Sequence, residues 1–184
     1  MTQQVINIGT APNDGTGDTR RVAGQKANDN FTELYGERWT YIRLTSDFPT
    51  SSATAVNITG LEFTPAANQR YEFRACLYTR TGTTTVGPRP GVAWATGLTD
   101  GVASIRQTSS ATANVFANGN INAAVLAPVG GLPSATLSYP AFIEGACFAG
   151  ASPSGTVRIQ LASETAGTTV TVKAGSFLRY RTVP

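Results

Sequence analysis

The sequence contains no histidine among its 184 residues. This absence excludes Ser-His-Asp and Cys-His nucleophile systems, zinc sites that use histidine, and the commonest general base near neutral pH. Its two cysteines, Cys76 and Cys147, are too few for a structural zinc site, and they are not spaced as a CxxC pair. No phosphate-binding loop or dinucleotide fingerprint occurs either. We therefore expect no enzyme, no cofactor and no metal site.

Charge is also scarce, because only 14% of the residues are charged, against about 25% in an average soluble domain. The basic residues are scattered singly, and Arg20-Arg21 is their only adjacent pair. This is not the clustered patch that nucleic-acid binding needs. The sequence also lacks a signal-peptide pattern and an apolar run long enough to span a bilayer. We expect no nucleic-acid partner, no membrane insertion and two buried free thiols.

Carboxylates remain, and a glycosidase needs only two of them. Glu144 stands in an apolar context and Glu164 ends a predicted strand, but a satisfied carboxylate is far commoner than a perturbed one. We interpret Glu144 as exposed or paired with an arginine, and we expect no polysaccharide hydrolysis. Residues 13–18 resemble a calcium loop faintly, but they lack the spacing and the final glutamate of an EF-hand. A plain turn before a helix is the better interpretation.

The composition that is present favours β-structure, because Thr, Ser, Ala and Gly are abundant while the usual helix formers are sparse. Residues 70–79 alternate apolar and polar side chains with the period of a strand. The same alternation recurs up to the C-terminus, and turn signals separate the segments. Residues 108–133 show the weakest pattern and predict a long loop or irregular strands. A mainly β fold is expected, as an antiparallel β-sandwich or jelly-roll over residues 40–184.

Residues 1–39 have a different character. The first 17 residues are rich in turn formers and predict an extended arm or loop. From Asp18 to Tyr35 the spacing predicts a short helix, with Asp18 as its N-cap. Ala27, Phe31 and Leu34 form its narrow apolar face. A helix this short must pack against something, either the β-domain of its own chain or the same helix in neighbouring subunits, and the spacing does not decide between them.

Residues 6–18, Ile-Asn-Ile-Gly-Thr-Ala-Pro-Asn-Asp-Gly-Thr-Gly-Asp, together with residues 25–35, closely resemble a segment found near the N-terminus of many tailed-bacteriophage fibre and appendage proteins. Residues 60–68 and 160–181 resemble parts of small phage β-domains. The resemblance covers roughly a third of the chain. It implies a homotrimeric virion component, assembled in the host bacterial cytoplasm, whose residues 1–39 attach to other virion proteins of capsid, tail or baseplate.

In many members of this family the segment joins a long fibre shaft, whereas no shaft repeats follow it here. The resemblance therefore implies a short tail fibre, head fibre, spike or decoration protein, with Ala27, Phe31 and Leu34 as trimer-contact candidates. A rival hypothesis is a module that binds a host surface glycan or protein. Tyr78, Trp94 and Tyr139 are its candidate receptor contacts, although aromatic residues in strands are more often buried.

Overall fold

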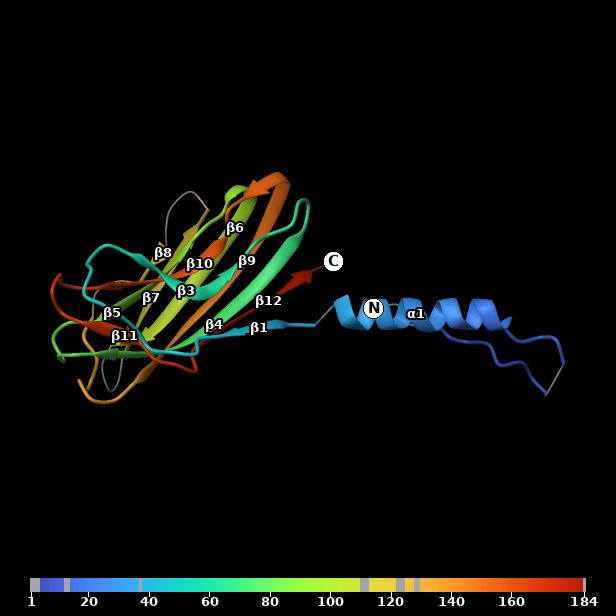
Figure 1. Ribbon diagram of the computed structural model, residues 1–184, viewed down its shortest axis with the longest axis horizontal. Coiled ribbons are helices and arrows are strands. Elements are labelled where there is room, and N and C mark those ends of the chain that lie inside the picture. Colours follow the sequence, from blue (N-terminus) through green and yellow to red (C-terminus); the bar gives the residue numbers. More distant parts are fainter. Residues whose placement is uncertain are drawn as a thin grey trace. The chain divides into compact units, whose positions relative to one another are not determined.

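The computed structural model describes residues 4–11, 14–36, 38–109, 113–121, 125–127 and 130–183. Contacts within the chain divide it into two compact units, Met1–Arg38 and Trp39–Pro184. We describe each unit by itself, as the N-terminal unit and the β-domain (Figure 1).

The N-terminal unit contains one helix, α1 (Arg20–Gly36). The hydroxyl oxygen of Thr19 accepts a hydrogen bond from the backbone N–H of Val22 at 3.3 Å, so Thr19 caps the helix. The prediction of Asp18 as N-cap is therefore wrong. Its carboxylate instead accepts a hydrogen bond from the backbone N–H of Asn7, which ties the arm to the start of the helix.

The β-domain is a sandwich of two antiparallel sheets, which confirms the predicted mainly β class. Within the described residues the larger sheet has eight strands and the smaller has four. The larger sheet follows the order β1 (Thr40–Arg43), β12 (Phe177–Val183), β4 (Arg70–Thr81), β9 (Tyr139–Ser154), β6 (Thr96–Thr108) and β7 (Asn114–Asn120), with β11 (Val170–Val172) and β2 (Phe48–Thr50) beside β4. The smaller sheet follows the order β3 (Val56–Phe63), β10 (Val157–Ser163), β5 (Pro88–Ala93) and β8 (Val125–Leu126).

Strand β4 shows why these residues form a sandwich. Its residues alternate strictly between buried and accessible positions over all twelve residues. The buried set faces the smaller sheet, and its apolar members, Phe73 and Leu77 among them, join the hydrophobic core cluster. The other set, including Arg74 and Cys76, lies on the outer face of the larger sheet. The period of two in the sequence thus gives β4 one buried face and one solvent face.

An aromatic cluster occupies one part of this core. The rings of Phe63 and Tyr180 are stacked with centroids 4.5 Å apart, and Phe73 contacts Trp94 edge-on at 5.9 Å. Phe73 also pairs directly with Gly145 of β9, where a β-carbon would lie only 2.3 Å from the ring. Glycine at this position therefore leaves the space that the phenyl ring fills.

The segment with the weakest pattern, residues 108–133, contains strands β7 and β8. β7 pairs with β6 along seven residues at one end of the larger sheet. β8 adds two residues beside β5. The prediction of irregular strands fits these two elements, while residues 110–112, 122–124 and 128–129 lie outside the described part.

Candidate functional site

The arm is organised around the carboxylate of Asp14. Its two oxygens accept hydrogen bonds from the backbone N–H groups of Thr10 and Ala11, both at 2.7 Å, and of Thr16 at 2.9 Å. The hydroxyl of Thr10 donates a fourth hydrogen bond at 2.7 Å. These donors, the Thr16 N–H first, hold the pKa of Asp14 well below its usual range. The carboxylate thus organises a turn, as the sequence suggested, rather than pointing away as a free ligand.

Gly9 makes this turn possible. Its φ of +81° lies in the left-handed region, and a β-carbon there would lie 2.7 Å from an oxygen of Asp14. The side chain of Asn7 closes the loop from the other side, since it accepts from the N–H of Gly9 and donates to the carbonyl of Thr16. The described parts of this loop, residues 7–11 and 14–18, are consequently held by their own polar groups.

Polar contacts also hold the arm along α1. The Asn30 side chain forms two hydrogen bonds of 2.9 Å with the backbone of Gln4, one as acceptor and one as donor. Lys26 donates to the carbonyl of Val5 at 3.0 Å and to the carboxylate of Asp18 at 2.8 Å. This lysine is the main cause of the lowered pKa of Asp18. The arm therefore covers the side of the helix that carries Lys26 and Asn30.

The large apolar side chains of the N-terminal unit point outwards. Ile8, in the loop, is 90% exposed, and Phe31 and Leu34 are 56% and 53% exposed. Ala27 is half-buried and shares a helix face with them, at i, i+4 and i+7. Among the described residues, the hydrogen-bonding contacts of the arm involve other positions of α1. Phe31 and Leu34 of the candidate trimer face are therefore exposed, while Ala27 is half-buried.

The three candidate receptor contacts do not form one platform. Tyr78 is 41% exposed on the outer face of β4. Trp94 packs against the core beside Phe73, between the two sheets. Tyr139 is half-buried at the start of β9, opposite the buried Thr79. Stacking on all three at once is therefore not available to one ligand, and Tyr78 is the most accessible of them.

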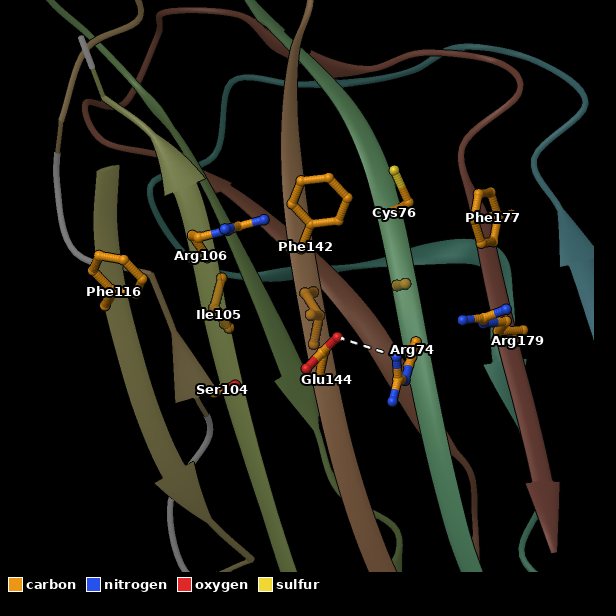
Figure 2. Close-up of a pocket in the computed structure, with 12 residues that line it drawn as sticks. Arg74, Cys76, Ser104, Ile105, Arg106, Phe116, Phe142, Glu144, Phe177 and Arg179 are labelled. Carbon is orange, nitrogen blue, oxygen red and sulfur yellow. Dashed lines mark ion pairs between the residues drawn. The ribbon is translucent and has the colours of Figure 1, made fainter. Parts of the chain in front are cut away.

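A groove that the sequence did not single out crosses the outer face of the larger sheet (Figure 2). Its volume is about 580 Å³, within the range of roughly 300–1,000 Å³ found for small-ligand sites. Rings and guanidinium groups dominate its surface. They belong to Phe116, Phe142, Phe177, Arg74, Arg106 and Arg179. We call this feature the outer groove.

Strand pairing explains how distant residues meet in the outer groove. Phe177 pairs with Cys76, which pairs with Phe142 on β9. Phe142 pairs with Arg106, which pairs with Phe116 on β7. These five residues form one row across five strands, and a second row beside it contains Arg179, Arg74, Glu144 and Ser104. An aromatic row therefore lies next to a row rich in charge.

The structure confirms the interpretation of Glu144 as an exposed, arginine-paired residue. Its carboxylate lies 3.6 Å from Arg74, and its side chain is 60% exposed. Figure 2 shows the two side chains directed toward each other from neighbouring strands. The other glutamate considered, Glu164, accepts a hydrogen bond from the backbone N–H of Gly87 at 2.9 Å. Each of the two carboxylates thus has a partner of its own, Arg74 for Glu144 and the N–H of Gly87 for Glu164.

Three arginines surround Trp39 at the start of the β-domain. Their guanidinium carbons lie 4.5 Å (Arg179), 5.0 Å (Arg181) and 5.9 Å (Arg74) from the indole centroid. Arg181 is also paired with Glu72 at 3.2 Å. Cation–π contacts of this kind contribute about 0.5–1 kcal/mol each at exposed sites. Together they fix the first residue of the β-domain on the outer face of the larger sheet.

The two cysteines are free, and they lie on opposite faces of the larger sheet. Cys147 is buried, and burial raises the pKa of its thiol to about 11. Cys76 is half-buried beside the outer groove, and burial raises its pKa as well. The prediction of free thiols is confirmed, although only Cys147 is fully buried.

In the described part of the chain, no helix combines the length and the apolar character needed to cross a membrane. The same residues contain no cluster of three or more histidine, cysteine or carboxylate side chains that could hold a metal ion.

Comparison with known proteins gives one family. No curated protein matches the chain. One solved structure that matches is that of infectious bursal disease virus, Gx strain, with 14% identity and a TM-score of 0.22. The match covers 80% of this chain and 37% of the viral chain, so this chain spans less than half of the length of the viral chain. The family described as "Bacteriophage T4 gp9/10-like protein, N-terminal" matches residues 3–129, more than half of the sequence, and the chain therefore belongs to this family of bacteriophage structural proteins.

Proposed function

We propose that the chain is a short homotrimeric fibre, spike or decoration protein of the virion, in which residues 1–39 attach to other virion proteins and residues 40–184 project outward. The observation that supports this proposal is the distribution of side chains in the N-terminal unit: polar side chains make the internal contacts, and large apolar side chains are exposed. Its polar side chains hold the arm on α1, while Ile8, Phe31 and Leu34 face outward. Such a unit has apolar surface to bury against other chains.

The trimer contact is assigned to α1. A helix of 17 residues gains most of its stability from packing of an apolar face. Full burial of a Leu or Phe side chain contributes about 1.5–3 kcal/mol, and in a trimer this gain occurs three times over. Three copies of the face around an axis would cover Phe31 and Leu34 without displacing the arm.

Replacing Phe31 and Leu34 together by serine is expected to convert a trimer into monomers at micromolar concentration. Light scattering coupled to size-exclusion chromatography measures the mass directly. The matched control is Val22→Ser, which removes an apolar side chain 44% exposed on the same helix but off this face, and it should leave the trimer intact. A wild-type protein that is monomeric under these conditions would contradict the trimer assignment.

Attachment is assigned to the loop over residues 7–18. Ile8 is a large apolar side chain held out from a loop whose backbone is fixed by Asp14 and Asn7. Rigid, exposed anchors of this kind carry much of the energy of protein interfaces.

Phage particles assembled with Ile8→Asp should contain little or none of the protein when purified virions are examined by mass spectrometry. Leu137→Asp, at a position 60% exposed in the β-domain, serves as control and should be incorporated normally. Normal incorporation of Ile8→Asp would refute the role of the loop.

Binding of a host receptor by the β-domain is the second candidate function. The observation that favours it is the outer groove, because its exposed rings and guanidinium groups are typical of recognition surfaces. This function does not exclude the first one, since the groove belongs to the β-domain and the attachment loop to the N-terminal unit.

A further inference from the structure

We propose that the outer groove binds an acidic polysaccharide whose carboxylates are carried on the sugar rings themselves, that is, a chain containing uronic acids. The inference rests on the receptor-binding function proposed above and names its ligand class and its site. It does not depend on the trimer contact assigned to α1.

Charge is the first argument. Three guanidinium groups line the groove, and they are accompanied by one carboxylate, that of Glu144. Within the described residues Glu144 has an ion pair with Arg74 alone, at 3.6 Å, and both side chains are largely exposed. In the described part of the chain no carboxylate lies within ion-pair distance of Arg106 or Arg179. A ligand that carries carboxylates would form ion pairs with these two guanidinium groups, because a guanidinium matches a carboxylate with two parallel hydrogen bonds.

These two guanidinium groups are also held in place before any ligand arrives. Arg106 lies over the ring of Phe142, 4.9 Å from its centroid, and Figure 2 shows it extending from β6 toward that ring. Arg179 donates a hydrogen bond of 3.0 Å to the hydroxyl of Tyr41 and lies over Trp39. Less side-chain freedom is lost on binding when the groups are already positioned.

The spacing of the rings is the second argument. Neighbouring strands lie about 4.8 Å apart, and Phe116, Phe142 and Phe177 occupy every second strand of their row. The rings therefore recur at intervals of about 10 Å along a line that crosses the strands. Phe116 is 65% exposed and the other two are half-buried. A chain of sugar rings can lie along such a line and place apolar C–H faces on the phenyl rings.

A uronic acid combines both features in one residue, because its ring offers an apolar face and carries a carboxylate. An acidic peptide fits less well. Extended peptides commonly bind by adding a strand to a sheet edge, where backbone groups are free, whereas the strands β4, β9 and β6 under the groove are paired on both sides. The face of the sheet therefore offers side chains only, and this favours the polysaccharide.

The test uses the full-length protein and titration calorimetry with an oligogalacturonate. Binding is expected to this probe and not to a neutral malto-oligosaccharide of equal length. Arg106→Ser should weaken it by about tenfold or more, since hydrogen bonds to charged groups contribute about 1.5–3 kcal/mol, and Phe116→Ala should weaken it as well. Both side chains are exposed, so folding is retained. The matched controls, Arg21→Ser and Leu137→Ala, remove an equal charge and an exposed apolar side chain elsewhere and should bind as the wild type does.

Four outcomes overturn the proposal: no binding of the oligogalacturonate, equal binding of the neutral sugar, equal binding of a polyglutamate peptide, or a loss of oligomeric mass in Arg106→Ser that would make this face a subunit interface. Inhibition of phage adsorption by the purified protein is measured in parallel. Inhibition without oligogalacturonate binding keeps the receptor function and rejects the ligand class. Binding without inhibition supports the site and rejects the receptor function.

Discussion

Replacing Phe73 by alanine is expected to lower the free energy of unfolding of the β-domain by about 3–5 kcal/mol. The phenyl ring is fully buried, contacts Phe63 and Trp94, and lies against Gly145. Its loss leaves a cavity at the centre of the aromatic cluster that both sheets contribute to. Guanidinium unfolding followed by tryptophan fluorescence reports on this domain, because both tryptophans lie within it.

The contact between Phe73 and Gly145 makes this prediction specific. Gly145→Ala alone is expected to cost about 1–3 kcal/mol through overpacking, because its β-carbon would lie 2.3 Å from a carbon of the ring and 2.8 Å from the carbonyl oxygen of Val102. In the double variant the new methyl group enters the space left by the ring. The loss in free energy of unfolding of the double variant should therefore be smaller than the sum of the losses of the two single variants. The difference should exceed the deviation of roughly 0.5 kcal/mol that is seen for independent sites.

Additive costs would show that Gly145 is strained by its backbone neighbours rather than by the ring. Val102→Ala provides a control on the neighbouring strand β6. Its side chain is 56% exposed on the outer face, so its replacement should change the free energy of unfolding by no more than about 0.5 kcal/mol.

Replacing Asp14 by alanine is expected to unfold the loop over residues 7–18 while leaving the β-domain unchanged. Three backbone N–H groups, those of Thr10, Ala11 and Thr16, lose their acceptor at once. Their hydrogen exchange, measured by nuclear magnetic resonance, should become faster by about tenfold or more. Asp100→Ala, an equal loss of charge at an exposed position of the β-domain, should leave these rates as they are. Unchanged exchange in Asp14→Ala would contradict the role given to this carboxylate.

The same contact predicts how the loop responds to acid. The pKa of Asp14 is lowered in the folded loop, chiefly by the Thr16 N–H, relative to about 3.9 in an unfolded chain. The ionised carboxylate therefore contributes its full stabilisation above about pH 3.9, and this contribution declines as the pH falls further and is lost once the pH has fallen through the lowered pKa. A titration of the Asp14 side-chain carbon resonance should have its midpoint well below that of the unfolded peptide. The loop should remain folded at pH values where ordinary aspartates are already half protonated.

The sequence predicted those parts of the fold that depend on local pattern. Residues 70–79 alternate so regularly that the buried and exposed faces of β4 could be assigned without a structure. The helix was predicted within two residues at its start, but its cap was assigned to Asp18 rather than Thr19. Both residues are good N-caps, and the choice depends on Asn7 and Lys26, which engage the Asp18 carboxylate from elsewhere in the chain.

The outer groove could not be predicted in this way. Phe116, Phe142 and Phe177 come from three strands far apart in the sequence, and only the register of five strands brings them into one row. β7 lies in the stretch with the weakest pattern. On β4, Arg74 alternates with the apolar set as an ordinary solvent-face residue does, and Cys76, which was expected to be buried, lies half-buried on the same outer face. A contact across the sheet depends on strand order, which alternation within one strand does not contain.

The closed set of hydrogen bonds in the loop has a consequence for how such proteins change over time. Asn7, Gly9, Asp14 and Thr16 satisfy one another within a dozen residues, and Lys26 and Asn30 of the adjoining helix complete the unit. Among the described residues, the groups that shape the loop are therefore carried by one short, contiguous stretch of coding sequence. Recombination can move that stretch in front of a different β-domain without separating residues that need each other, so the N-terminal unit and the β-domain are free to evolve at different rates.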